Sequence, residues 1–354
     1  MTSKITYSEA GVDLNRVREA HAAIGRLIAQ TFISRKNRFG ELLNEYGHYA
    51  ALLNISETTA LALHADGVGT KVLIAQMMDK YDTVGIDCVA MNVNDLICCG
   101  AEPAALVDYL ALESSNPALA EQLMKGLVKG AKQSNIAVVG GETAIMPDVI
   151  KGVKPGYGFD LAALSIGVVE KANVILGDKV KVGDTVIGIR SSGPHSNGYT
   201  LIRKIIQREN IPLNTTLTGT SKKLGEILLT PTKIYVKEVL ALVEAGLASG
   251  LAHITGGAFT KLMRITKNRI GFDIEMPKPD GVFTSLQEWG RVDTAEMYRT
   301  FNMGIGFCII TPPENECEAL KKISAAGSKA QVLGHTIREA KVKIKTYDDK
   351  ILTY

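Results

Sequence analysis

Short apolar segments with a strand-like pattern alternate with amphipathic segments along both halves of this 354-residue chain. Residues 59–65 and 159–170 have strand character, whereas 117–134 has helical periodicity and begins after the capping residue Asn116. A turn-rich stretch at 171–184 separates the two halves. Because strands and helices are mixed on both sides of this stretch, the sequence predicts an α+β fold with two domains.

The turn-rich stretch sets the predicted boundary, with one domain over residues 1–170 and the other over 171–354. Before the first strand, residues 12–32 have an amphipathic pattern in which Val17 and Leu27 share one apolar stripe. A helix is expected there.

The composition excludes several classes of protein. Hydrophobic residues make up 46% of the chain, charged residues 22%, and the net charge is +3 without a block of basic residues. Nucleic acid is therefore not expected as a partner. No apolar run approaches the ~20 residues of a membrane span, and the N-terminus lacks the apolar core of a signal peptide. Five cysteines without a disulfide spacing favour a cytoplasmic protein with reduced thiols.

The stretch ADGVGTK lies between a strand-like and a helix-like segment. It is not a P-loop, which needs G-x-x-x-x-G-K-[ST]. Backbone N–H groups of Gly67, Gly69 and Thr70 at the start of a helix would attract a phosphate. Lys71 would add a point charge, and Asp66 would tolerate the phosphate if Mg²⁺ bridged them. Taken alone, a tight turn with a capping aspartate and a solvated lysine explains the stretch equally well.

A second polar group lies inside the apolar, helix-like segment GIDCVAMNVNDLICCG. Asp87 and Asn94 are two helical turns apart and nearly in line, and Asp95 lies beside them. Acidic side chains in so apolar a helix are costly to bury unless they are paired or bound to a metal. The pattern therefore favours a functional polar group on this helix, with Asp95 as a candidate metal ligand. An N-cap at Asp87 followed by an exposed polar seam is the alternative.

The third group follows residues 136–141, which are expected to form a buried strand that ends at paired glycines, directly before Glu142. Carboxylates on such loops commonly hold metals and ligands. Together with Asp66 and Asp95, Glu142 predicts a site for Mg²⁺ and a nucleotide in the first domain. A hairpin that exposes Glu142 is the alternative.

Two glycine-rich loops in the second domain each carry a histidine, His195 in SSGPHSNGY and His253 in AHITGGAF. The neighbouring residues suited to ligand contacts are Ser196, Asn197, Thr255 and Gly256. Each histidine has a structural interpretation that is as strong as a role in acid–base chemistry or phosphate binding.

These motifs resemble, in content and order, those of the aminoimidazole ribonucleotide synthetases, also called phosphoribosylformylglycinamidine cyclo-ligases. The resemblance covers about residues 7 to 340 and both domains. SSGPHSNGY, TPTKIYVK and MYRTFN are specific to this enzyme, whereas DG-x-GTK, ND and GGET are shared by a wider ATP-binding superfamily.

The resemblance implies a homodimer in which the N-terminal domains join their mixed sheets into a central barrel. C-terminal domains with α/β layers would complete the nucleotide cleft. It also implies the reaction of formylglycinamidine ribonucleotide and ATP to aminoimidazole ribonucleotide, ADP and phosphate, in de novo purine biosynthesis. The formyl amide oxygen would attack the γ-phosphate, and ring closure of the resulting iminophosphate would expel phosphate without a covalent enzyme nucleophile.

The resemblance also implies roles for single residues. The ligands implied for Mg²⁺ are Asp66, Asp95 and Glu142. The contacts implied for ATP or substrate are Gly67, Gly69, Thr70, Lys71, Asp87, Asn94, Ser196, Asn197, Thr255 and Gly256. The catalytic residues implied are His195, His253 and Lys71, with His195 as the best candidate for proton transfer.

One segment departs from the family pattern. Relatives carry a glycine-rich stretch after the first helix, and here residues 33–55 keep only Tyr46-Gly47 of it. Nucleotide contacts of that stretch therefore do not carry over. His48, or the basic side chains just upstream (Arg35, Lys36 and Arg38), are the alternatives.

Two other functional classes remain open at this point. The first is another enzyme of the superfamily: formylglycinamidine synthetase, thiamine-phosphate kinase, selenophosphate synthetase or a hydrogenase-maturation protein. The second is an ATP-binding regulatory subunit without catalysis, which predicts the loss of a carboxylate or a loop histidine. No such loss is visible, and GPHSNG argues against the kinase.

Overall fold

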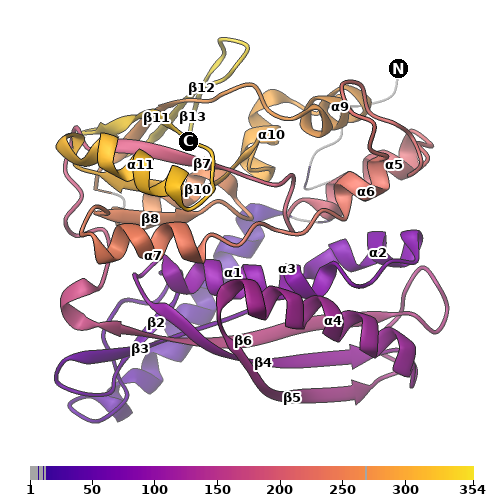
Figure 1. Ribbon diagram of the computed structural model, residues 1–354, viewed down its shortest axis with the longest axis horizontal. Helices are drawn as coiled ribbons and strands as arrows, with labels where there is room; N and C mark the ends of the chain where they lie inside the picture. The colour runs from indigo at the N-terminus through magenta and orange to yellow at the C-terminus, as the bar shows by residue number, and fades with distance from the viewer. Residues whose placement is uncertain (1–6, 8–10, 12, 268) are drawn as a thin grey trace.

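The computed structural model describes residues 7, 11, 13–267 and 269–354. Its N-terminal half forms a six-stranded sheet in the order β1-β2-β3-β6-β4-β5 (Figure 1). The strands are β1 (Glu41–Leu42), β2 (Ala51–Asn54), β3 (Thr59–Gly67), β4 (Glu102–Leu112), β5 (Ala137–Ile145) and β6 (Phe159–Glu170). The pairing of β4 with β5 is parallel, and the other four neighbouring pairs are antiparallel.

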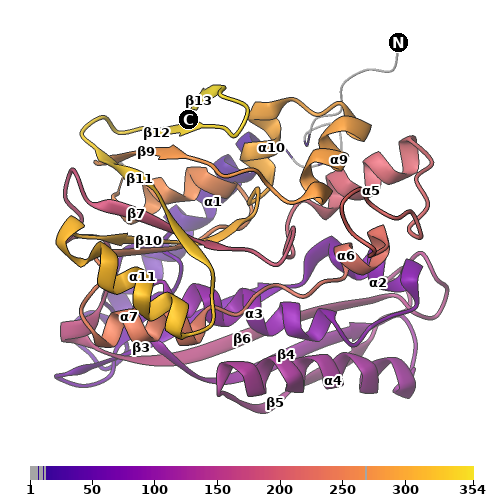
Figure 2. The ribbon, with the colours of Figure 1, turned by 45° about the horizontal axis from the view of Figure 1, so that its top comes forward.

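The helices of this half are α1 (Leu14–Ile28), the 3-10 helices η1 (Ala29–Arg35) and η2 (Gly69–Lys71), α2 (Val72–Met78), α3 (Val84–Ile97) and α4 (Pro117–Ser134). α3 lies between the N-terminal sheet and the C-terminal half of the chain (Figures 1 and 2). Every residue of α3 is buried. The other face of the sheet carries the exposed apolar side chains Val107, Tyr109, Leu164 and Val168.

The C-terminal half contains a seven-stranded sheet in the order β13-β12-β9-β11-β7-β10-β8. Its strands are β7 (Thr185–Arg190), β8 (Gly250–His253), β9 (Gly271–Glu275), β10 (Ile305–Thr311), β11 (Ala330–Ile337), β12 (Val342–Lys345) and β13 (Ile351–Thr353). Its helices are α5 (Tyr199–Arg208), α6 (Leu224–Leu228), α7 (Val236–Glu244), α8 (Leu262–Ile265), α9 (Gly281–Gly290), α10 (Thr294–Thr300) and α11 (Glu316–Ala325). The short 3-10 helices are η3 (Lys171–Asn173), η4 (Ala258–Lys261) and η5 (Pro313–Asn315).

The expected mixture of strands and helices in two halves is confirmed, while one local prediction needs correction. β5 does not end at Gly140-Gly141 but continues to Ile145, because β4 pairs with it along its length. The helix expected over residues 12–32 is present as α1 and η1. Its apolar stripe is exposed in the single chain, with Val17 39% and Leu27 65% accessible. Among the described residues, none of the helices has the length and hydropathy needed to cross a membrane.

Candidate active site

Most of the predicted site residues meet where α3 faces the C-terminal half. The segment after β3 and the loop after β7 are joined by a hydrogen bond from Lys71 to the carbonyl oxygen of His195. The loop after β8 lies beside them, because a Cβ on Gly256 would stand 3.1 Å from Asn197 Oδ1. The fold therefore brings motifs from both halves together.

Asp95 is a buried carboxylate at the centre of this region. Its Oδ1 accepts a hydrogen bond from Nδ1 of His253, on β8, at 2.7 Å, and its Oδ2 lies 3.5 Å from Nε2 of His64 on β3. Asp66 is the penultimate residue of the same strand as His64. Asn92 of α3 fixes the Asp66 backbone, because its side chain accepts from Asp66 N and donates to Asp66 O. The metal ligands predicted at Asp66 and Asp95 are thus held by neighbouring elements.

The two carboxylates repel each other. Burial raises the pKa of the Asp66 carboxyl, and the negative charge of Asp95 raises it further. Burial would also raise the pKa of Asp95, but the hydrogen bond from His253 and the charges of His64 and Lys261 outweigh it and hold that pKa at about 2. A divalent cation between the carboxylates would relieve the repulsion.

Glu142 does not join these two carboxylates. Asp66 on β3 is paired through Ala163 on β6 with Asp108 on β4, so these three residues form one row across the sheet. Glu142 on β5 is paired with Tyr109 on β4, in the next row. Neighbouring rows of a sheet point to opposite faces. Glu142 therefore lies on the face opposite Asp66 and is exposed. Across the described part of the chain, no group of three His, Cys, Asp or Glu side chains is arranged to hold a metal ion.

Lys71 does not face a ligand. Its side chain is completely buried and its ammonium donates to Asp87 Oδ1 at 2.9 Å, to the His195 carbonyl at 3.0 Å and to the Thr230 carbonyl at 2.7 Å. An ammonium has three protons, and all three are used. The predicted contact between Lys71 and an ATP phosphate is incompatible with this arrangement.

Asp87 and Asn94 also bind protein groups rather than facing open space. Asp87 Oδ1 accepts from the backbone N–H of Thr232 at 2.7 Å and from its hydroxyl at 2.6 Å. Asn94 donates to the Lys233 carbonyl at 2.8 Å and accepts from the Tyr235 N–H at 2.9 Å. The polar line predicted on this helix is present, but it holds residues 232–235 of the C-terminal half against α3.

The backbone of the ADGVGTK loop offers less to a phosphate than predicted. The Gly67 N–H already donates to Asp66 Oδ1 at 2.7 Å. Gly69 has a left-handed backbone (φ +69°) and open space around its Cβ position, so a ligand can approach it. Thr70 is exposed, and its hydroxyl lies 3.1 Å from that of Thr200. Gly69 and Thr70 are the accessible part of the loop.

His195 is buried in a left-handed conformation (φ 62°). Its Nε2 accepts a hydrogen bond from the Ser192 N–H at 3.3 Å, so the neutral ring carries its proton on Nδ1, where no protein partner is found. Burial lowers the pKa of His195, and the charges of His253, Lys71 and Lys233 lower it further. Nδ2 of Asn197 is another buried donor in this loop without a hydrogen-bond partner. Ser196 Oγ lies 3.3 Å from the hydroxyl oxygen of Thr232. Two unpaired donors therefore remain in this loop for a ligand.

His253 is fully buried, and both of its ring nitrogens are occupied. Nδ1 donates to Asp95, and Nε2 lies 3.4 Å from Asn94 Nδ2. The predicted contact between His253 and a phosphate is therefore incompatible with the structure. Its role is to hold Asp95 ionised and in place.

Lys261 and His64 are functional candidates that the motif reading missed. Lys261 donates a hydrogen bond to the Thr255 hydroxyl and lies near enough to Asp95 to lower the pKa of that carboxyl. Burial lowers the pKa of Lys261, and the negative charge of Asp95 opposes that effect. Lys261 is therefore a candidate for the cationic group of the site in place of Lys71. The signal was present, since Lys261 follows the TGGAF loop by two residues.

A cavity of about 520 Å³ adjoins this region and contains part of the divergent 33–55 segment. It is lined by Leu43, Asn44, Glu45, Tyr46, Gly47, His48, Leu176, Asp178, Arg264 and Lys267. Burial lowers the pKa of His48 to about 4, against the weaker opposing effect of Asp95. His48 is therefore neutral at pH 7.

The neutral state of His48 predicts acid sensitivity. Its folded pKa lies below the unfolded value of 6.5, so the stability it contributes is complete above about pH 6.5 and is lost as pH falls to about 4. Between pH 7 and 4, wild type should lose about 2 kcal/mol more unfolding free energy than His48→Gln, measured by urea unfolding at each pH. The matched control is His335→Gln, because the His335 side chain is exposed on β11. This variant should keep the wild-type pH dependence of stability. Equal losses in wild type and His48→Gln would contradict the account.

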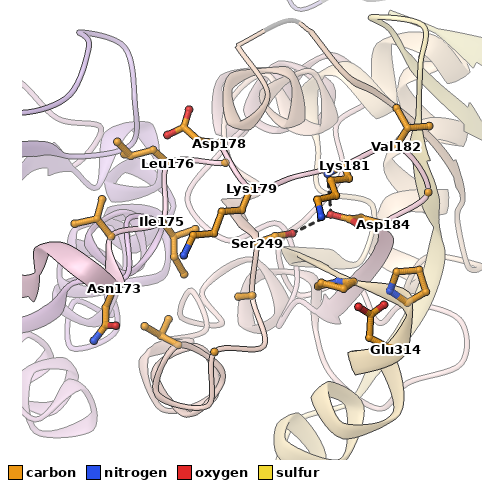
Figure 3. Close-up of a pocket in the computed structure, with 18 of the residues that line it drawn as sticks. Asn173, Ile175, Leu176, Asp178, Lys179, Lys181, Val182, Asp184, Ser249 and Glu314 are labelled. Atoms are coloured by element: carbon orange, nitrogen blue, oxygen red, sulfur yellow. Dashed lines mark hydrogen bonds between the residues drawn. The ribbon is translucent and has the colours of Figure 1, made fainter.

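A second cavity, of about 660 Å³, lies beside the segment that links the two halves (Figure 3). Residues 172–179 form one side of it, and Ser249 and Glu314 come from the C-terminal half. Asp184 accepts hydrogen bonds there from the Lys181 N–H and the Ser249 hydroxyl. Its lining does not include any of the predicted site residues.

Comparison with known proteins assigns both halves to one family. The family model described as AIR synthase related protein, N-terminal domain, matches residues 47–169, and the one for the C-terminal domain matches residues 181–346. The phosphoribosylformylglycinamidine cyclo-ligase of Pyrococcus horikoshii is 48% identical over 347 residues, which is 97% of this chain and 98% of that protein. That of Methanosarcina barkeri is 48% identical over 319 residues, 90% of this chain and 92% of its own.

Solved structures share the fold at lower identity. T. maritima PurL complexed with ATP superposes with a TM-score of 0.59 at 14% identity over 92% of this chain. The chain spans about half of PurL, covering 47% of it. The protein tt0281 from Thermus thermophilus gives a TM-score of 0.60 at 20% identity and is covered to 89%. Since both domain models match in order and the named relatives are matched over almost their full length, the chain belongs to the phosphoribosylformylglycinamidine cyclo-ligase family.

Proposed function

We propose that this protein closes the imidazole ring of purine biosynthesis, converting formylglycinamidine ribonucleotide and ATP to aminoimidazole ribonucleotide, ADP and phosphate. The observation that carries the proposal is the 48% identity with a named cyclo-ligase over 97% of this chain. Two fold neighbours support it in outline, because T. maritima PurL was solved complexed with ATP and complexed with FGAR.

In the proposed reaction the formyl amide oxygen attacks the γ-phosphorus of ATP and ADP leaves. A substrate nitrogen then attacks the activated carbon, the C–O bond to phosphate breaks, and the nitrogen loses a proton. The side chains support positioning rather than covalent catalysis. His195 Nδ1 and Asn197 Nδ2 are buried donors that could bind substrate oxygens, and His195 is the candidate for proton transfer. Lys261, Thr255 and the Gly256 backbone are placed to receive a phosphate.

Mg²⁺ fits the carboxylate pair. Asp66 and Asp95 supply two anionic oxygens, and Mg²⁺ in nucleotide sites takes one or two carboxylates together with substrate phosphates. Bound there, Mg²⁺ would neutralise negative charge on the transferred phosphoryl group. The chain's own contribution is to keep Asp95 ionised and oriented through His253 and His64.

The test is turnover by purified protein with Mg²⁺-ATP and formylglycinamidine ribonucleotide, following the diazotisable aminoimidazole and phosphate. Formation of both in equal amounts supports the cyclo-ligase. Phosphate without aminoimidazole would mean that the acceptor is another molecule. Neither product from folded, ATP-binding protein would favour a regulatory subunit.

The proposal includes a cytoplasmic homodimer of chains with domains at 1–170 and 171–354. All five cysteines are free thiols, which suits a reducing compartment. The apolar outer face of the N-terminal sheet supports pairing of two sheets into a barrel, because monomers rarely expose such a face.

Replacing Tyr109, 40% exposed on that face, by glutamate should place two charges in the pairing surface and convert the protein to monomers. Analytical ultracentrifugation measures the result. Ile351→Glu is the matched control, since Ile351 is 62% exposed on β13 of the other domain and should leave the dimer intact. A Tyr109→Glu protein that sediments like wild type would exclude this face as the interface.

A further inference from the structure

The buried pair of Lys71 and Asp87 crosses the boundary between the two halves of the chain. Lys71 and Asp87 belong to the N-terminal half, and their partners His195, Thr230 and Thr232 belong to the C-terminal half. Both side chains of the pair are 0% exposed. All three ammonium protons of Lys71 and the Oδ1 atom of Asp87 are bound to protein groups.

Stability alone does not account for such a pair. Taking both charges out of water is expensive, and apolar residues of similar volume often stabilise a protein as well or better. The pair is also incompletely satisfied, because Asp87 Oδ2 is buried and has no hydrogen-bond partner. A buried ion pair is therefore better explained by the geometry it imposes.

That geometry is the shape of the loop 191–198. Lys71 holds the carbonyl of His195, a non-glycine residue at φ 62°, where the backbone is rarely stable without outside support. Asp87 holds Thr232, whose hydroxyl lies 3.3 Å from Ser196 Oγ. The same loop carries the unpaired donors His195 Nδ1 and Asn197 Nδ2.

We propose that Lys71 and Asp87 are positioning residues, a buried interdomain ion pair that fixes the 191–198 loop so that His195 and Asn197 present their donors to the substrate. The proposal rests on the proposed function for its kinetic part. It assigns the lysine of the ADGVGTK motif to loop geometry and leaves phosphate binding to Lys261, Thr255 and the Gly256 backbone.

The first variant is Lys71→Met. We expect kcat to fall about 100-fold, the cost of a misplacement of about 1 Å in a positioned site. The dissociation constant of Mg²⁺-ATP, measured by calorimetry, should stay within about twofold, because the lysine makes no ligand contact. A loss of ATP affinity of about tenfold or more would overturn the proposal, since it would show direct phosphate binding.

The double variant Lys71→Met/Asp87→Leu separates positioning from stability. Replacing both charges by apolar side chains leaves no unpaired buried charge, so the fold should be retained. We expect its kcat to remain about 100-fold low. Recovery to within about threefold of wild type would mean that the pair only stabilises the protein, and would overturn the proposal. Lys80→Met is the matched control, because it breaks the exposed Lys80–Asp82 pair and should change nothing.

Two further measurements keep the proposal testable if these variants fold poorly or if the assigned reaction is wrong. Thr232→Val leaves both charges of the pair in place and removes only a hydroxyl, and it should lower kcat about tenfold with ATP binding unchanged. Hydrogen exchange of residues 191–198 in ligand-free protein should quicken in Lys71→Met and Thr232→Val but not in Lys80→Met. This readout needs no substrate. Unchanged exchange in both variants would overturn the positioning role of Lys71 and Asp87, even if the reaction is confirmed. Quickened exchange together with a failed turnover assay would reject only the proposed cyclo-ligase activity.

Discussion

Asp95→Asn should lower kcat by about 100- to 1,000-fold while leaving the protein folded, the range seen when one charge-stabilising group is removed from an enclosed site. Asparagine has the shape of aspartate and can still accept the hydrogen bond from His253 Nδ1 that Asp95 now accepts at 2.7 Å. The variant removes the negative charge and replaces the oxygen that lies 3.5 Å from His64 Nε2 with an amide NH2 group. That charge is what the pairing of Asp66 with Asp95 offers to a metal bound together with ATP phosphates.

The melting temperature of Asp95→Asn shows whether the variant is folded. It should change by only a few degrees, because the packing and the hydrogen bond from His253 are kept. The pKa of Asp95 is about 2, so the carboxylate is ionised throughout the range in which turnover is measured. The wild-type pH–rate profile should therefore show no titration of this group between pH 5 and 8. Retention of kcat within about threefold in Asp95→Asn would contradict the assignment of Asp95 to the charged centre of the site.

Gly85→Ala should destabilise the protein by about 3 kcal/mol or more, through overpacking of two helices. Gly85 lies on α3 where α4 crosses it, and a Cβ there would stand 2.3 Å from Leu127 N and 2.4 Å from Leu123 O. Both are backbone atoms, so the helices would have to separate. Because α3 carries Asp87, Asn94 and Asp95, the shift would also weaken the site.

Gly126 lies on the α4 side of the same crossing, where a Cβ would stand 2.5 Å from Asp82 O and 3.1 Å from Gly85 N. Gly126→Ala should therefore lower the free energy of unfolding by a similar amount. The double variant should lose less than the sum of the two single losses, because the first substitution has already separated the helices. Urea unfolding measures all three. Lys129→Ala, on the exposed face of α4, is the control and should cost little. Full additivity, or a cost below about 1 kcal/mol for Gly85→Ala, would contradict this packing.

Local chemistry was sufficient to predict several elements. α4 begins where Asn116 caps it, with its side chain accepting from the Leu119 N–H at 3.1 Å. β3 and β6 appear as expected from their apolar pattern, and all of β3 pairs with residues 162–170 of β6. Each of these elements depends mainly on residues within its own segment.

The end of β5 was predicted wrongly from the local sequence. Paired glycines usually mark a turn, but β4 supplies hydrogen-bond partners on both sides of Gly140-Gly141 and the strand continues. The extension fixes the alternation of faces, which places Glu142 away from Asp66. No property of residues 136–143 alone distinguishes the two outcomes.

The roles of Lys71 and His253 depend on residues far away in the sequence. The motif around Lys71 looks like a phosphate loop, yet its acceptors are carbonyls at His195 and Thr230. His253 similarly meets Asp95, 158 residues earlier. Sequence patterns identified these side chains as unusual, and only the packing of the two halves shows what they bind.

The most direct test of the account is turnover of formylglycinamidine ribonucleotide that carries ¹⁸O in its formyl group, with mass spectrometry of the phosphate released. If the amide oxygen attacks the γ-phosphorus, aminoimidazole ribonucleotide and phosphate form in equal amounts and the label appears in the phosphate. Unlabelled phosphate, or phosphate without the aminoimidazole, would contradict the proposed chemistry at this site.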